Sequence, residues 1–246
     1  MTATVDRRPW GLWALALLAI VAFSGLGRWQ LGRAEQKRAM LARAAEAMRS
    51  RVPRPLAVID DPARASGYDW IDVEGRFLDA PAVLLDNQQH AGAVGVRAYR
   101  AFETREGRTV LVDLGWIALP GDRRMPRVPL YAARTRLVGL LMPPPARGLL
   151  AGPPVPQADG ALLATALDPS ALRQPLRVAT LSPRVLRPQP EAGFGYQRDF
   201  EILPNTMPPE RHIGYAVQWF ALAATVLITA VLLTWRRARR RTGDSA

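Results

Sequence analysis

The sequence predicts an α+β membrane protein in which two transmembrane helices flank a mainly antiparallel β domain of barrel or sandwich type. Two stretches carry no charge: Trp10 to Leu26, and Ile213 to Trp235 over 23 positions. Of the 22 prolines, Pro9 precedes the first stretch and the other 21 lie between Pro53 and Pro209. Because proline interrupts a helix, we expect helical ends and a non-helical middle. With 49% hydrophobic residues the chain is expected to fold.

Residues 10–27 form the first expected transmembrane helix. The same run also fits the apolar part of a secretory signal, because Arg7 and Arg8 precede it. The chain continues at once into LGRWQLGRAEQK, which is typical of an ordered segment, so we expect a retained anchor. Apolar residues recur at helical spacing over the next turns, which predicts that residues 28–52 continue as an amphipathic helix.

Residues 212–235 form the second expected transmembrane helix. The charge-free run within it is about 35 Å long at roughly 1.5 Å per residue, enough to cross a hydrocarbon core about 30 Å thick. Five arginines follow in residues 236–246, and basic residues beside a membrane helix tend to stay cytoplasmic. Residues 1–9 are then cytoplasmic and residues 53–211 extracytoplasmic. The basic segment after the first helix argues against this orientation, but long domains translocate with little regard for charge.

The middle region is expected to be rich in strands. Consecutive strands without intervening helices favour an antiparallel sheet. One short helix is expected at DPSALR, with Asp168 as its N-cap and Pro169 as its first residue. The expected strands, each bounded by Gly, Pro, Asp or Asn, are WIDVEGRF, AVLLD, GVRAYRAF, GRTVLVDLGWI, RTRLVGLL and PLRVATL.

The composition excludes several kinds of function. The net charge of +12 comes mainly from the arginine tail and from residues 28–54, so we expect no nucleic-acid partner. Absence of cysteine excludes thiol redox chemistry and cysteine-ligated metals. There is no G-x-S-x-G nucleophile elbow, and His90, in DNQQHAGAVG, is expected to be a polar loop residue. We therefore expect no enzymatic activity.

His212 stands at the head of the second apolar run. On a helix, His212, Tyr215, Ala216, Trp219 and Ala223 fall at i, i+3, i+4, i+7 and i+11, which places them on one face. One interpretation is an interfacial anchor, because aromatic residues gather at membrane edges. The other is a flat apolar ligand lying along this face, with the imidazole as axial ligand to its iron.

Four polar and aromatic residues stand at the corresponding end of the first helix: Arg28, Trp29, Gln30 and Arg33. They can anchor this helix to lipid. Together with His212 they can also form a site with an aromatic wall and with guanidinium groups suited to carboxylates, such as haem propionates.

Three motifs, in order and between two terminal membrane helices, resemble the Surfeit-locus family of cytochrome c oxidase assembly proteins. They are LGRWQLGRAEQK, GRTVLVDLGWI and RHIGYAVQWFALA, and the family patterns are W-Q-L-x-R, V-N-R-G-W and H-x-x-Y-A-x-x-W-F. Asp113 and Leu114 replace the usual Asn-Arg, and the link NTMPPERH is longer than usual. The matching residues are Trp29, Gln30 and Arg33, then Gly115 and Trp116, then His212, Tyr215, Ala216, Trp219 and Phe220.

The resemblance implies a bacterial inner-membrane assembly factor that receives haem a and helps its insertion into oxidase subunit I. The expected cofactor is haem a, and the expected partners are subunit I, a haem a synthase and the lipid bilayer. His212 would ligate the iron, Tyr215 and Trp219 would line the macrocycle, and Arg33 or Arg211 would meet the propionates; Trp29 and Gln30 complete the expected site. Two alternatives stay open: a membrane-anchored scaffold for oxidase subunits that binds no haem, and a membrane-bound hydrolase with a serine or carboxylate site in the β domain.

Overall fold

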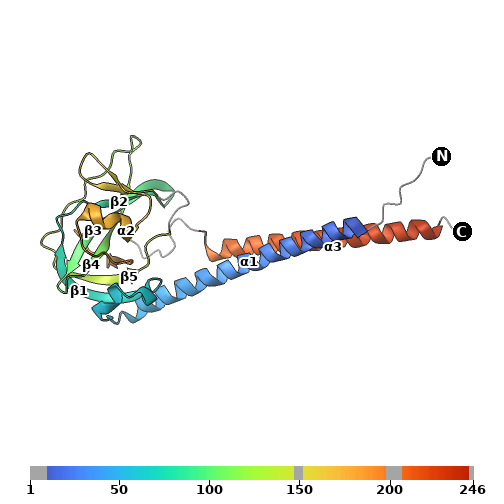
Figure 1. Ribbon diagram of the computed structural model, residues 1–246, viewed down its shortest axis with the longest axis horizontal. Coiled ribbons are helices and arrows are strands. Elements are labelled where there is room, and N and C mark those ends of the chain that lie inside the picture. Colours follow the sequence, from blue (N-terminus) through green and yellow to red (C-terminus); the bar gives the residue numbers. More distant parts are fainter. Residues whose placement is uncertain (1–9, 147–151, 198–206, 244–246) are drawn as a thin grey trace. The chain divides into compact units, whose positions relative to one another are not determined.

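The computed structural model describes residues 10–146, 152–197 and 207–243 (Figure 1). The chain divides into two compact units: a helical unit, residues 1–40 with 207–246, and a β unit, residues 41–206. The expected cytoplasmic segment 1–9 and the last three residues of the basic tail lie outside the described residues.

Two long helices supply the helical unit, α1 (Trp10–Ser50) and α3 (Pro209–Gly243). α1 covers the first apolar run and the amphipathic segment without a break, and α3 continues through the arginine tail. Each carries a stretch long and apolar enough to cross a membrane, in which only 6% of residues in α1 and 11% in α3 are buried. Apolar helices exposed in this way are consistent with a membrane anchor.

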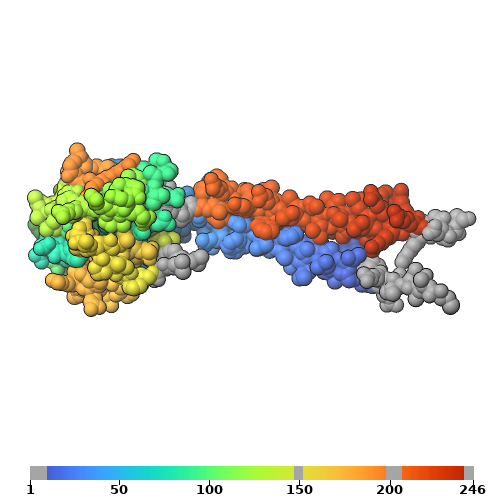
Figure 2. Space-filling model, turned by 90° about the horizontal axis from the view of Figure 1, so that it is seen from above, coloured from blue at the N-terminus to red at the C-terminus, as the bar shows by residue number. Residues whose placement is uncertain are grey.

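The helices of this unit run antiparallel and in contact, as the adjoining blue and red surfaces in Figure 2 show. Near one end, Nε1 of Trp13 donates to Oγ1 of Thr234 at 3.1 Å. Further along, the rings of Phe23 and Trp219 stack with their centroids 5.6 Å apart. A Cβ atom at Gly27 would lie 2.8 Å from the Phe220 ring, so the missing side chain of Gly27 allows this close approach.

An eight-stranded sheet forms most of the β unit, in the order β1-β5-β8-β4-β3-β2-β7-β6. Six strand pairings are antiparallel, while β4 with β8 and β2 with β7 are parallel. β1 pairs with both β5 and β3, so β1, β5, β8, β4 and β3 form a closed circuit of hydrogen-bonded strands. The strands are β1 (Asp69–Phe77), β2 (Val83–His90), β3 (Ala93–Thr104), β4 (Thr109–Ala118), β5 (Arg136–Met142), β6 (Val155–Pro156), β7 (Leu162–Ala164) and β8 (Val185–Pro188).

This arrangement confirms a mostly strand domain between two terminal apolar helices. The first eight residues of β4 are all buried, which explains why its sequence is an almost continuous apolar run. Aromatic rings fill the centre of the unit: Phe77 contacts Phe102 edge-on at 5.2 Å and lies 6.1 Å from Phe194. Two short 3-10 helices, η1 (Leu56–Ile59) and η2 (Pro62–Arg64), precede β1.

Two local predictions are wrong. PLRVATL is not a strand: its first two residues end helix α2 (Pro169–Leu176), and Arg177 adopts a left-handed conformation with φ 56°. The helix prediction beside it is confirmed, because the Asp168 side chain accepts from the Ser170 backbone N–H. His90 does not lie in a loop but ends β2, where Ala91 and Gly92, both at positive φ, turn the chain into β3.

Candidate functional site

Gln30 of α1 and His212 of α3 meet in the helical unit. Pro209 opens α3, which places His212 in its first turn. Nδ1 of His212 lies 2.6 Å from Oε1 of Gln30. Because a carbonyl oxygen can only accept, Nδ1 is the donor and carries the proton. In the neutral imidazole the other ring nitrogen, Nε2, then keeps its lone pair.

The free lone pair of His212 lies in a buried position. The residue is only 8% exposed, and within the described part of the chain Nε2 has no hydrogen-bond partner. A buried polar atom without a partner costs about 1–3 kcal/mol, which a ligand bound to Nε2 would offset. Metal-binding histidines are commonly held by a hydrogen bond from the opposite ring nitrogen, as Gln30 holds this one. A metal could reach Nε2 only after the side chain or the helix ends move.

Two cationic side chains of α1, Arg33 and Lys37, act on His212. Nη1 of Arg33 donates to Oε1 of Gln36 at 3.0 Å, and Nζ of Lys37 donates to the backbone carbonyl of Met207. Both cations act electrostatically on the imidazole. Lys37 was not among the residues expected at the site. The sequence could have indicated Lys37, because it stands seven residues after Gln30 and a helix places both residues on one face.

The aromatic residues expected around His212 are distributed differently. Trp219 packs against Phe23 inside the helix pair. Trp29 is 57% exposed and Tyr215 is 42% exposed, so these two side chains lie on the outer surface of the unit. The structure thus brings Gln30 to His212, adds Lys37, and leaves Trp29 and Tyr215 available to a ligand or to lipid.

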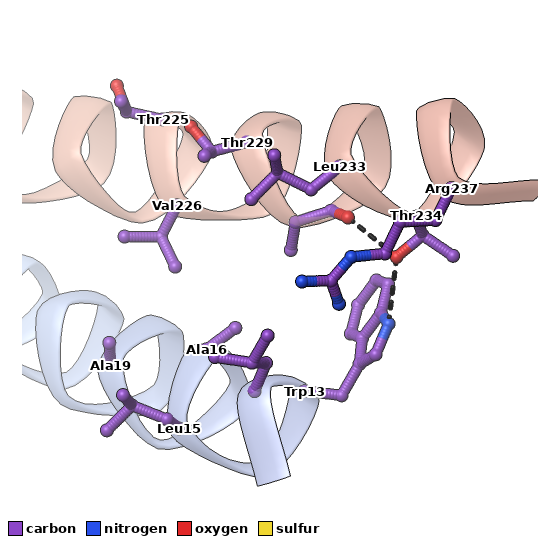
Figure 3. A pocket seen from close by; sticks show the side chains of 12 residues that line it. Trp13, Leu15, Ala16, Ala19, Thr225, Val226, Thr229, Leu233, Thr234 and Arg237 are labelled. Carbon is purple, nitrogen blue, oxygen red and sulfur yellow. Dashed lines mark hydrogen bonds between the residues drawn. The ribbon is translucent and has the colours of Figure 1, made fainter. Parts of the chain in front are cut away.

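A separate apolar hollow lies at the other end of the helix pair (Figure 3). Its volume is about 360 Å³. Small side chains such as Ala16, Ala19 and Ala230 leave this space, and Arg237 lines it as the single charged residue. No histidine or carboxylate lines it, so the hollow can hold an apolar chain but cannot coordinate a metal.

The second sequence motif has a structural role in the β unit. Gly115 adopts φ 114°, and Nε1 of Trp116 donates to the carbonyl of Gln88 at 2.9 Å. The His90 ring lies 5.3 Å from that of Trp116. These contacts hold the end of β2 to β4.

Asp113 is fully buried and fully bonded. Its Oδ2 accepts from Arg97 at 2.9 Å and from Arg187 at 2.8 Å, and its Oδ1 accepts from the Gly115 N–H at 3.0 Å. Burial would raise the pKa of this carboxyl, but the two guanidinium groups outweigh burial and lower it. Leu114, the next residue, lies in the core.

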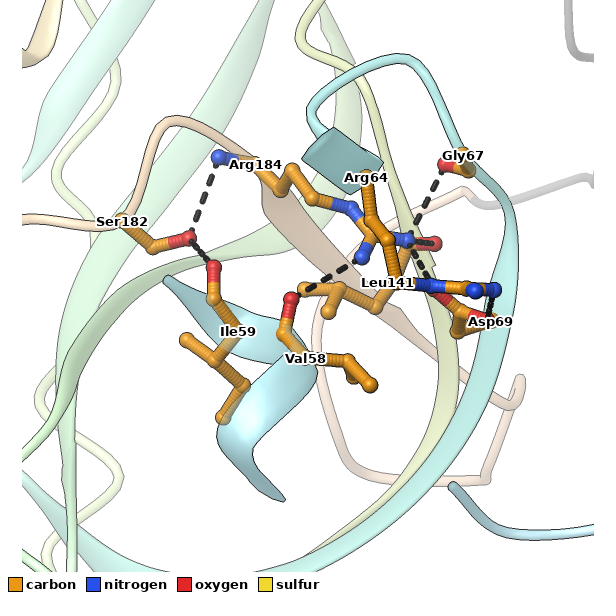
Figure 4. Close-up of polar contacts among 8 residues, drawn as sticks. All are labelled: Val58, Ile59, Arg64, Gly67, Asp69, Leu141, Ser182 and Arg184. Carbon is orange, nitrogen blue, oxygen red and sulfur yellow. Dashed lines mark hydrogen bonds and ion pairs between the residues drawn. The ribbon is translucent and has the colours of Figure 1, made fainter. Parts of the chain in front are cut away.

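A second buried ion pair joins Asp69 of β1 to Arg184, the residue before β8, and Arg184 also contacts η1 (Figure 4). The fully buried Arg184 contacts Asp69 at 2.8 Å and donates to the carbonyls of Val58, Gly67 and Leu141 at 2.9–3.1 Å. Nε of Arg64 donates to the same carboxylate at 3.0 Å. Both of the most buried carboxylates in the described β unit are thus held by arginines, which disfavours their use in hydrolysis. Among the described residues no three His, Asp or Glu side chains cluster as metal ligands.

Comparison with curated proteins finds no match to the chain. A family model described as the SURF1 family matches residues 17–224. This range contains all three motifs, from Trp29 through Trp116 to Phe220, and most of both units. The chain therefore belongs to the SURF1 family, the Surf1-type family of cytochrome c oxidase assembly proteins.

Proposed function

We propose that this protein holds haem a at the end of the helix pair that contains His212 and passes it toward cytochrome c oxidase subunit I. Family membership implies a role in oxidase assembly. Haem a delivery, with a haem a synthase as donor and subunit I as acceptor, is the specific role we propose. The chain would catalyse no reaction of its own.

One observation carries the proposal: His212 presents an unprotonated, buried Nε2 whose tautomer is fixed by Gln30. A neutral imidazole is a common axial ligand of haem iron. Haem a, when bound, would supply the iron that Nε2 of His212 ligates. A histidine with a purely structural role would usually satisfy both ring nitrogens, because leaving one of them buried and unbonded costs free energy.

The surrounding residues fit the rest of such a ligand. Arg33, Lys37 and Arg211 bring positive charge to the carboxylates of the propionates. Trp29 and Tyr215 offer exposed aromatic surface to the macrocycle. Haem a is largely apolar, so a site on membrane helices would keep it out of water.

The membrane placement belongs to the same proposal. Arginines follow the apolar stretch of α3, which favours a cytoplasmic position for that end. We propose a bacterial inner-membrane protein with both termini in the cytoplasm and the β unit outside. His212 then lies at the outer edge of the bilayer.

The test uses the two histidines of the chain as a matched pair. The protein is co-produced with a haem a synthase, purified in detergent, and its haem a content is measured from the absorption spectrum for wild type, His212→Ala and His90→Ala. We expect His212→Ala to lose the pigment and His90→Ala to keep it. Equal haem a in wild type and His212→Ala would remove the ligand role.

A second candidate is a scaffold that binds oxidase subunits and no haem. Burial of Nε2 favours it, since the His212–Gln30 hydrogen bond then serves to join the two helices. Co-purification of subunit I with wild type and with His212→Ala, in the absence of pigment from both, would support the scaffold instead.

A further inference from the structure

A cleft in the β unit lies where the last turns of α1 meet η2 and β1. Its volume is about 680 Å³, within the range of about 300–1,000 Å³ that is typical of ligand sites. The side chains that define its chemistry are Arg43, Arg54, Arg64, Tyr68, Asp69 and Trp70.

The cleft carries uncompensated positive charge. Asp69 is already bound by Arg64 and Arg184, and Glu46 at the rim pairs with Arg49. Within the described part of the chain, the guanidinium groups of Arg43 and Arg54 have no carboxylate partner. An arginine fork binds a carboxylate through two parallel hydrogen bonds, so both groups are available to an external anion.

A hydroxyl group adds to these donors. Tyr68 lines the cleft, and its side chain makes no hydrogen bond to any described residue. Burial raises the pKa of Tyr68 although Arg43 and Arg187 act in the opposite direction. The phenol therefore keeps its proton and can donate it to an oxygen acceptor.

Apolar side chains stand between the charged ones. Val52 at the rim is 63% exposed, and Ala47 and Trp70 line the interior. Arg51 lies over the Trp70 ring at 5.5 Å, which adds a further cation beside the cleft. The lining thus contains both cationic side chains that can bind oxygen anions and apolar side chains that can contact aliphatic groups.

We propose that this cleft binds an acidic, partly apolar segment of a partner protein, with its carboxylates on Arg43 and Arg54. The alternative anion is a lipid phosphate. We favour a peptide over a lipid phosphate because apolar side chains stand among the cations of the lining, so the cleft offers contacts to aliphatic side chains as well as to anions.

The test measures peptide binding by the full chain in neutral detergent. The probe is a fluorescein-labelled peptide, Gly-Glu-Leu-Glu-Gly-Glu-Leu-Glu-Gly, followed by fluorescence anisotropy, and the control peptide has Gln in place of every Glu. We expect binding of the Glu peptide only, weakened about tenfold or more in Arg43→Gln/Arg54→Gln and about threefold in Tyr68→Phe. Circular dichroism melting checks that each variant is folded.

A matched double variant, Arg38→Gln/Arg105→Gln, removes the same charge from exposed positions outside the cleft. It is expected to bind like wild type. Equal weakening in the two double variants, or equal binding of the Gln peptide, would overturn the proposal. So would phosphatidylglycerol vesicles that bind through Arg43 and Arg54 when the Glu peptide does not. None of these measurements involves haem, so their outcome is independent of the haem a proposal.

Discussion

His212 in the helical unit and Asp113 in the β unit are both buried polar residues, 8% and 0% exposed. Asp113 has hydrogen bonds on both oxygens and two guanidinium partners. His212 has one bonded nitrogen and one nitrogen without a partner among the described residues. The difference separates a polar group whose hydrogen bonds are all made within the fold from one with an unused nitrogen, which in the proposed function binds the haem iron.

The two sites also differ in what removal would leave behind. Without Asp113, the side chains of Arg97 and Arg187 would stay buried with excess positive charge, which is costly in a low-dielectric interior. Without His212, one part-buried hydrogen bond to Gln30 is lost, and the unsatisfied Nε2 disappears with the side chain. Stability should therefore depend strongly on the first residue and weakly on the second.

The largest effect is expected for Asp113→Ala. We expect a loss of about 3–5 kcal/mol in the free energy of unfolding, because two buried arginines lose their counter-ion. His212→Ala should change the same quantity by less than about 1 kcal/mol. Denaturation in detergent, followed by circular dichroism, measures both. Asp122→Ala, on the exposed surface, is the control; a loss for Asp113→Ala no larger than for this control would refute the comparison.

A smaller effect is expected from Gln30→Leu. Loss of the acceptor at Nδ1 should weaken haem a binding about 10–100-fold, the usual cost of removing a partner of a metal-bound histidine. Gln30→Glu should preserve binding, since a carboxylate also accepts from Nδ1. Gln36→Leu, on the same helix but bonded to Arg33, is the matched variant. If Gln36→Leu weakens binding as much as Gln30→Leu, Gln30 does not orient the ligand. Titration of the purified chain with haem a, followed by absorbance, gives the Kd values.

The smallest expected effect is a change in the pH dependence of stability, which comes from titration of Asp113 and is absent near neutral pH. Its folded-state pKa is lowered by Arg187 and Arg97, below the unfolded value of about 3.9. Its stabilisation is therefore complete above about pH 4 and is lost as pH falls through the folded-state pKa. Melting temperatures of wild type should decline below about pH 4, and those of Asp113→Asn, which does not titrate, should decline less. Parallel pH curves would contradict this assignment.

Hydrophobic pattern and proline placement were enough to predict most elements. Both long helices, the Asp168-capped helix and five strands follow from local signals. The β8 strand does not, because its four residues are defined by pairing with β4 and β5 rather than by their own pattern. The strand prediction for PLRVATL was wrong because its first two residues are the end of a helix that is capped by Asp168 and begins at Pro169.

For the site, the motifs predicted which residues matter but not their partners. Gln30 and His212 were both expected, but their hydrogen bond could not be predicted, because it depends on how two helices align and the two residues are 182 positions apart in sequence. Phe23 was missed for the same reason, whereas Lys37 could have been found from its position seven residues after Gln30 on the same helix face. Trp219 and Trp29 look equivalent in sequence, but Trp219 is half-buried against Phe23 while Trp29 is exposed.

The sequence by itself determined two apolar helices, a strand-rich middle and the family, because these depend on composition, spacing and order of motifs along the chain. Only the tertiary structure decided that Nε2 of His212 is the nitrogen left with a lone pair, that Asp113 is locked between arginines, and that Arg43 and Arg54 share a cleft. Each of these depends on distances of a few ångströms between residues far apart in the chain, which local patterns do not encode.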